Sequence, residues 1–188
     1  MPGNVYQYIT SFQYFISMPY LYAGYKPAVI KLKREMVKLR AATQGDALRI
    51  RLLEKELIGF ERELVPAIQD GDDIWYYDIA GIIDDHENSL LLVIEADNEL
   101  VGCGIGQIRK NKHYYKLPYF GFIGMMCVKA AYRNNGYGGD IIKELLRWFK
   151  TKNIEEVRLT VFPNNPGAIK AYQKLGFEDF LLEMKLEI

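Results

Sequence analysis

The chain has 188 residues, with 24 Lys and Arg against 24 Asp and Glu, and 49% of its residues are hydrophobic. This composition excludes an intrinsically disordered chain, which combines low hydrophobicity with high net charge, and a formal charge of zero argues against nucleic acid as the main partner. Two cysteines and two histidines are too few for a disulfide scaffold and offer little for a metal site, so we expect a cytoplasmic protein without a metal.

The N-terminal 25 residues carry no charge and alternate aromatic with polar residues. A signal peptide needs a positive start and an aliphatic stretch, and the longest apolar run, Leu90–Ile94, is far shorter than the about 20 residues that span a bilayer. We therefore expect neither export nor a membrane partner. The alternation favours a strand-like arm, formed by residues 1–35, that covers the domain or a second subunit. A translation start at Met36 and an arm that contacts substrate are the alternatives.

The first predicted elements follow a charge-dense connector that begins at Lys31. A strand over Val37–Ala42 comes first, and Thr43 and Asp46 then form a capping box. The helix that follows has apolar residues at helical spacing from Leu48 to Leu64. Residues 74–83 form a second helix or a turn-rich segment, before the polar loop 84–88.

The rest of the chain alternates apolar strands with two amphipathic helices. Asn165 caps the second of these helices, with Pro166 at its first position and Gly176 as its stop. The predicted strands are 90–96, 100–108, 122–128, 157–162 and 181–188, and the two helices are 138–152 and 166–175. This order predicts one α/β domain with a mixed sheet and helices packed on it.

A glycine-rich loop, Arg133-Asn134-Asn135-Gly136-Tyr137-Gly138-Gly139, lies between a strand and a helix. Its glycine amides can approach a ligand closely, and the helix that follows presents unpaired N–H groups and a positive dipole end. Arg133 adds a charge suited to phosphate oxygens. The loop has neither the P-loop pattern nor the dinucleotide fingerprint, so it indicates a pyrophosphate nest of another kind or a plain turn.

A second motif decides between these interpretations. Asn165, Ala168, Tyr172, Gly176 and Phe177 recur at the spacing Asn-x-x-Ala-x-x-x-Tyr-x-x-x-Gly-Phe. Together with the loop, this helix resembles the GCN5-related N-acetyltransferase (GNAT) superfamily over residues 36–188. The resemblance implies a mixed, mostly antiparallel sheet with splayed central strands, flanked by helices. It also implies transfer of an acetyl group from acetyl-CoA to a primary amine.

The resemblance assigns the cofactor contacts by position. The main chain of Met126, Cys127 and Val128 would face the pantetheine arm, and an N–H near Met126 would polarise the thioester carbonyl. The amides of residues 134–139 would hold the pyrophosphate, and Asn165 and Ala168 would face the cofactor. Tyr172 would protonate the leaving thiolate or donate a hydrogen bond to it; the second role fits better, since a thiol is a stronger acid than tyrosine.

No acidic residue stands on strand 122–128, where many relatives carry a catalytic carboxylate. Gly124 or Met125 fills that place. Glu95 on the neighbouring strand, acting through a water molecule, is the first candidate for a general base. The other candidates are Asp84, Asp85, His86 and His113, and an acceptor amine that binds neutral would need no base. Cys127 is expected to be a buried structural thiol.

The acceptor is a primary amine: a small amine, a lysine or a protein N-terminus. We expect helix 46–64 and segment 74–88 to line its side of the site, with aromatic residues and a set of acidic residues suited to a cation. A homodimer is expected, with the aromatic arm as its apolar surface. The alternative function is a non-catalytic acyl-CoA-binding or sensing module of the same fold.

Overall fold

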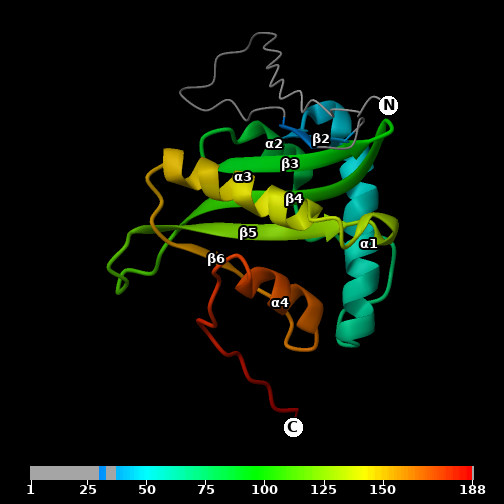
Figure 1. The fold of residues 1–188 in the computed structure, drawn as a ribbon. Coiled ribbons are helices and arrows are strands. Elements are labelled where there is room, and N and C mark those ends of the chain that lie inside the picture. Colours follow the sequence, from blue (N-terminus) through cyan, green and yellow to red (C-terminus); the bar gives the residue numbers. More distant parts are fainter. Residues whose placement is uncertain (1–29, 33–36, 188) are drawn as a thin grey trace, which may run out of the picture.

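The computed structural model describes residues 30–32 and 37–187 of the chain (Figure 1). The predicted aromatic arm therefore lies outside the described residues, apart from residues 30–32. Within the described residues, no helix is both long and apolar enough to cross a bilayer.

One six-stranded sheet, in the order β1-β2-β3-β4-β5-β6, forms the centre of the molecule. Neighbours from β1 to β5 are antiparallel, and β6 pairs with β5 in parallel. The strands are β1 (Ile30–Leu32), β2 (Val37–Ala41), β3 (Ser89–Ala96), β4 (Glu99–Lys110), β5 (Tyr119–Val128) and β6 (Val157–Leu159). The predicted mixed, mostly antiparallel α/β fold is therefore confirmed.

Helices cover both faces of the sheet (Figure 1). The helices are α1 (Ala47–Leu64), α2 (Ile79–Asp84), α3 (Tyr137–Thr151) and α4 (Pro166–Gln173), with single 3-10 turns at Gln44–Asp46 and Ala130–Tyr132. One buried cluster lies between the sheet and α3, and it includes Ile141, Leu145 and Phe149. The second lies between the sheet and α1 with α2, and it includes Ile50 and Leu53.

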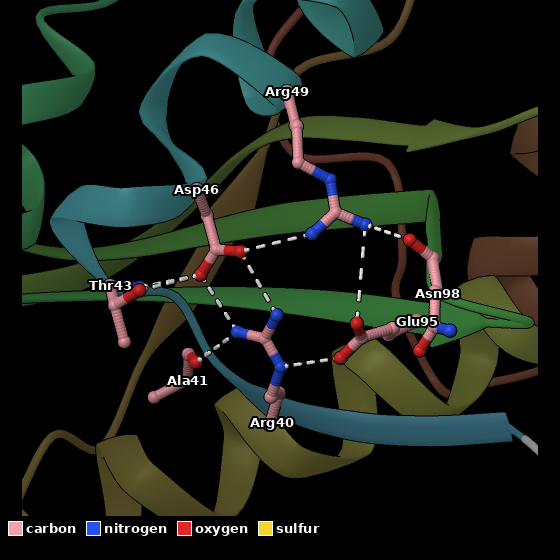
Figure 2. Close-up of polar contacts among 7 residues, drawn as sticks. All are labelled: Arg40, Ala41, Thr43, Asp46, Arg49, Glu95 and Asn98. Carbon is pink, nitrogen blue, oxygen red and sulfur yellow. Dashed lines mark hydrogen bonds and ion pairs between the residues drawn. The ribbon is translucent and has the colours of Figure 1, made fainter.

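An ion-pair network joins β2, β3 and the start of α1 (Figure 2). Arg40 donates to both carboxylate oxygens of Asp46, at 2.7 and 2.9 Å, and to Glu95 at 3.0 Å. Asp46 also accepts from the backbone N–H and the hydroxyl of Thr43, so the predicted capping box is confirmed. The network fixes the turn between the sheet edge and the first long helix.

Four predicted elements differ in the structure. Residues 30–32, expected at the end of the N-terminal arm and the start of the connector, form β1 because they pair with β2. The helix expected over residues 74–83 begins only at Ile79, where Asp78 caps it. The strand expected over 157–162 ends at Leu159, because its pairing with β5 ends there.

The strand predicted over 181–188 is wrong for the described residues, since 178–187 form no strand. The large apolar side chains of this segment are exposed. Alternating apolar and charged residues predicted a strand, but the segment lies against no partner strand.

Candidate functional site

A bulge in β5 shapes the candidate site. The register between β4 and β5 shifts between Cys103 and Ile105, because β5 uses one more residue than β4 across this step. Met125 adopts a left-handed conformation with φ of 47°, which is uncommon for a residue with a side chain. An extra residue bends a strand and re-aims its backbone groups, so the strand pattern is broken next to Met126.

The pairing of β5 with β6 ends just before this bulge. Its registered pairs run only from Gly121 with Val157 to Ile123 with Leu159. Among the described residues, no strand lies against the β6 side of residues 124–128. Backbone groups on such an edge are suited to pairing with an extended ligand that carries amides.

Tyr77 lies in the segment between α1 and α2 and contacts the bulge from the α1 face of the sheet. Its hydroxyl accepts the Met125 N–H at 3.2 Å, and a Cβ built on Gly124 would lie 2.6 Å from the same oxygen. The phenol thus occupies the space of a side chain at position 124. Burial raises the pKa of Tyr77, so its hydroxyl stays protonated at neutral pH.

Glu54 fixes the segment that carries Tyr77. This side chain is fully buried on α1, where it accepts the N–H groups of Tyr76 and Tyr77 at 2.8 and 3.0 Å and pairs with Arg51 at 2.5 Å. The guanidinium carbon of Arg51 lies 5.1 Å from the centre of the Trp75 ring. A buried charge with these partners is a structural anchor, and the sequence pattern did not indicate it.

The Cys127 side chain lies on the face of the sheet that α1 covers. Its thiol lies 3.4 Å from the Leu53 carbonyl oxygen, and burial raises its pKa to about 12. The predicted buried structural thiol is confirmed. The Met126 side chain packs on the opposite side, since a Cβ on Gly104 would lie 2.6 Å from its sulfur.

The glycine-rich loop leads from β5 into α3. Gly136 has φ of 85° and caps α3, a conformation that glycine adopts without strain. A Cβ built on Gly138 or Gly139 would meet no atom within 4 Å. The loop therefore offers an open helix N-terminus, which fits an anion such as a pyrophosphate.

The side chains of the loop do not all face the same way. Arg133 donates to the Val128 carbonyl at 3.0 Å and packs over the Phe60 ring. Asn135 donates to the carbonyls of Tyr132 and Arg133, and the Tyr137 side chain is buried in the core. For Asn135 and Tyr137 the main chain therefore remains the candidate for ligand contacts, whereas the exposed Arg133 uses only its Nε in the bond to Val128, and Asn134 has φ of 63°.

Helix α4 carries Tyr172, which packs against Phe177 and the core cluster under α3. Asn165 accepts the Ala168 N–H at 3.2 Å as the predicted helix cap. Asn164 donates to the Leu64 carbonyl, which ties the start of α4 to the end of α1. Burial, and then the charge of Glu61 on α1, raise the pKa of Tyr172. The two side chains therefore lie in the same electrostatic environment.

Glu61 is a functional candidate that the sequence did not reveal. Burial raises the pKa of its carboxyl group, although a hydrogen bond with Tyr76 opposes the shift. Its charge also contributes to the raised pKa values of Tyr77 and Cys127, after burial. A half-buried carboxylate whose charge reaches both Tyr77 and Tyr172 is suited to proton transfer.

The residues that the sequence suggested as general bases are engaged in other contacts or lie in loops away from the β5 bulge. Glu95 sits in the Arg40 network and within 4.0 Å of Arg49 (Figure 2). Asp84 accepts from Gln44, and Asp85 accepts from the backbone and side chain of Asn88. His86 lies in that same loop, and His113 packs edge-on against Tyr114 in the loop between β4 and β5. In the described part of the chain, no cluster of His, Cys, Asp and Glu could hold a metal ion.

Comparison with known proteins identifies the family. The model of the Acetyltransferase (GNAT) family matches residues 50–177. The chain belongs to the GNAT acetyltransferase family. This match includes the β5 bulge, the glycine-rich loop and α4, and the resemblance inferred from the two motifs is confirmed.

Curated relatives share short stretches with this GNAT chain. L-amino acid N-acetyltransferase AaaT of Escherichia coli is 31% identical over 91 residues, which cover 46% of this chain and 52% of the relative. N-alpha-acetyltransferase 30 of Homo sapiens is 30% identical over 79 residues, 42% of this chain and 21% of the human protein. The chain thus spans about half or less of the length of these relatives.

A solved structure shares the fold at low sequence identity. The aminoglycoside N-acetyltransferase AAC(6')-Iy, in complex with CoA, aligns with a TM-score of 0.64 and 20% identity. The alignment covers 84% of this chain and 98% of that enzyme.

Proposed function

We propose that this protein transfers the acetyl group of acetyl-CoA to a primary amine. The observation that carries the proposal is the bulged end of β5. Among the described residues it lacks a neighbouring strand on its β6 side, and the glycine-rich loop leads from it to the open helix N-terminus of α3. An extended arm with amide groups and a pyrophosphate fits these two features in that order. Membership of the family and the CoA complex of a structural neighbour support the assignment.

The main chain of Met126 and Val128 would hold the pantetheine arm. The amides of residues 134–139 would hold the pyrophosphate, and Arg133 braces the loop against the end of β5. When bound, the cosubstrate supplies an acetyl group on a thioester, activated for attack by an amine. No metal enters this proposal.

Main-chain geometry at the bulge would polarise the thioester carbonyl. Tyr77 accepts the Met125 N–H, so that group is engaged, and the N–H of Met126 would be the donor to the carbonyl. A fixed donor at the position where negative charge develops is typically the largest single contribution to such catalysis. Tyr77 acts here as a positioning residue.

Glu61 would accept the proton of the acceptor ammonium, directly or through water. A carboxyl group with a raised pKa is a stronger base than an ordinary glutamate. Tyr172 would donate a hydrogen bond to the leaving sulfur, because its raised pKa makes full proton transfer to a thiolate less favourable. Glu95 remains in its structural network in this scheme.

The acceptor would bind between α1 and the segment before α2. Phe60, Trp75 and Tyr76 contribute aromatic surface there, and Trp75 and Tyr76 are 44% and 40% exposed. Of the acidic residues expected to attract a cation, Asp72 is already paired with Lys55 at 2.6 Å. We therefore propose Glu61 as the main attraction for a cationic amine.

Titration calorimetry with acetyl-CoA tests the cofactor assignment. The wild type should bind, and Gly138→Trp should not, because the indole would fill the space where the ligand approaches. The open surroundings of Gly138 mean that this substitution leaves the fold intact. Leu48→Trp, at a side chain 82% exposed on the first turn of α1, is the matched control and should bind like wild type.

An amine screen with thiol detection then tests transfer. Saturable release of CoA in the presence of an amine supports the enzyme. Binding without transfer to any amine would support the acyl-CoA-binding module instead. Absence of binding by the wild type would overturn both assignments.

A further inference from the structure

The loop between β4 and β5 carries a dense set of basic residues. It projects beyond the sheet at the end of β5 that lies opposite the glycine-rich loop (Figure 1). Four exposed basic side chains at this loop form what we call the cationic tip: Lys110, Lys112, His113 and Lys116. No acidic residue occurs in the sequence between Glu99 and Asp140, so the hairpin that carries the tip supplies no negative charge of its own.

The lysines of the cationic tip have no acidic partner in the described part of the chain. None of the ion pairs between described residues includes Lys110, Lys112 or Lys116. The nearest acidic residues in the sheet, Glu155 and Glu156, precede β6, and Glu156 is already paired with an arginine of that strand at 2.5 Å. Like charges that gather without a partner repel one another, so this surface favours an anionic ligand.

The loop that presents the tip is held in place by its own contacts. Asn111 is buried, and its backbone and side chain donate to the carbonyls of Pro118 and Leu117 at 2.8 and 3.0 Å. The guanidinium carbon of Arg158 on β6 lies 4.8 Å from the centre of the Tyr115 ring. A surface that is ordered before binding loses less conformational freedom when a ligand binds.

The tip lies in line with the proposed site. Strand β5 begins at Tyr119, beside the tip, and reaches its bulge after Gly124, a distance of about 17 Å at the rise of an extended strand. Arg109 continues the positive charge toward the bulge, since its guanidinium carbon lies 3.5 Å from the centre of the Phe122 ring. Its charge acts on Tyr77, where it opposes the larger effect of burial on the pKa.

We propose that the cationic tip binds an acidic segment of a polypeptide acceptor whose reactive amine lies at the β5 bulge. This proposal rests on the proposed acetyl transfer, and it narrows the acceptor to a polypeptide with acidic residues about five positions from the amine. A small amine is too short to contact both places. Nucleic acid is anionic but has no aliphatic primary amine, and Tyr114 and Arg158 already contact the Tyr115 ring on which a base would stack.

Fluorescence anisotropy with two matched peptides tests the docking without any need for catalysis. Each peptide has a free N-terminal amine, a serine spacer of about four residues and a dye at its C-terminus. One carries a run of glutamates after the spacer, and the other carries glutamines. At about 0.01 M salt the wild type should bind the glutamate peptide about tenfold more tightly, and the difference should vanish at about 1 M salt.

A triple substitution assigns the preference to the tip, because each exposed ion pair alone contributes little. The tip variant, which should bind both peptides alike, combines Lys110→Gln, Lys112→Gln and Lys116→Gln. The control removes the same charge from exposed lysines of β2 and α3 and should bind like wild type: Lys38→Gln, Lys143→Gln and Lys150→Gln. Equal binding of both peptides by the wild type, or a preference that persists in the tip variant, would overturn the proposal. Tighter binding of a labelled single-stranded RNA would also overturn it.

CoA release with the same two peptides separates this proposal from the proposed function. The wild type should acetylate both, with a KM about tenfold lower for the glutamate peptide and an unchanged kcat. The tip variant should lose the difference in KM and keep the same kcat. Transfer with equal KM values in the wild type would leave the acetyltransferase intact and overturn the role of the tip. A glutamate peptide that binds through the tip but is never acetylated would overturn its assignment as an acceptor.

Discussion

Glu61 is the residue on which the proposed proton transfer depends. Replacing it by Gln keeps the size of the side chain and removes the base, so we expect kcat to fall about 100- to 10,000-fold, the range typical of general bases. The raised pKa of the Glu61 carboxyl should place the acidic limb of the wild-type rate profile above the pH of an ordinary glutamate. Activity is lost as the pH falls through this pKa, because the carboxyl group becomes protonated.

The control for Glu61 is on the same helix. Glu63 is exposed, and Glu63→Gln should leave both kcat and the acidic limb unchanged. Acetyl-CoA binding by calorimetry should be the same in both variants. An acidic limb that persists in Glu61→Gln would assign the titration to another group.

Tyr172 is expected to act through a hydrogen bond and not as a full acid. Tyr172→Phe removes one hydrogen bond to a charged leaving group, worth about 1.5–3 kcal/mol, so kcat should fall about 10- to 100-fold. The ring contact with Phe177, 6.2 Å between centroids, is retained in the variant. The pKa of Tyr172 is raised by burial and by Glu61, so the rate of the wild type should show no loss from this group up to about pH 10.

Some residues of the proposed site contact partners close to them in the sequence, and others contact partners far away in it. Asn165 and Gly136 act on their neighbours in sequence, and motif spacing was enough to find them. Tyr77 meets Met125 across 48 positions, and the charge of Glu61 on α1 acts on Tyr172 of α4, far along the chain. No local sequence pattern encodes such contacts. Because β5 carries no acidic residue, the sequence pointed to Glu95 as the general base, but the structure pairs Glu95 with Arg40 and Arg49.

At the scale of elements, the junction of β2 and α1 depends on Asp46. The carboxylate is 4% exposed and accepts from Arg40 and Thr43. Asp46→Asn should lower the free energy of unfolding by about 2–3 kcal/mol, the value of hydrogen bonds to a charged group. For a domain of this size, that corresponds to a melting temperature about 5–10 °C lower. Asp70→Asn, at an exposed loop position, should change neither quantity.

The contribution of Asp46 should also depend on pH. The hydrogen bond from Arg40 holds the pKa of this carboxyl group well below its ordinary value in the folded protein, despite the opposing effect of burial. Its contribution is therefore complete above the unfolded pKa, about 3.9, and is lost as the pH falls toward the lower folded value. Denaturant unfolding at pH 7 and pH 3 should show a smaller difference between wild type and Asp46→Asn at pH 3. An equal difference at both values would mean that the charge of Asp46 is not the cause.

Elements with strong periodicity or a defined cap were predictable, and elements defined by their partners were not. Helix α1 has a capping box and helical spacing, and β3 and β4 are joined by a tight turn, so their bounds agree with the structure within a few residues. Strand β6 ends where β5 ceases to pair with it. Residues 181–187 have strand periodicity but pair with no strand among the described residues, and periodicity alone does not indicate which edge a strand will join.

At the scale of the whole molecule, α4 is the least firmly packed of the elements around the site. Helix α3 contributes seven buried residues, whereas α4 contributes none. Its attachment rests on half-buried side chains, Tyr172, Leu175 and Phe177. Local opening requires less free energy where fewer apolar side chains are buried. A ligand bound between β5 and α4 would add apolar and polar contacts to this helix.

Hydrogen exchange followed by mass spectrometry should therefore show a selective effect of acetyl-CoA. Without ligand, the amides of residues 169–174 should exchange faster than those of residues 141–149 in α3. A saturating ligand at about 100 times its Kd stabilises the bound state by about 2.7 kcal/mol, which would slow exchange through local opening of α4 by about 100-fold. The core of α3 should change little unless it exchanges by global unfolding. Gly138→Trp should show no ligand effect in either helix. Equal protection of both helices would mean that the ligand's stabilising contacts are not made selectively with α4.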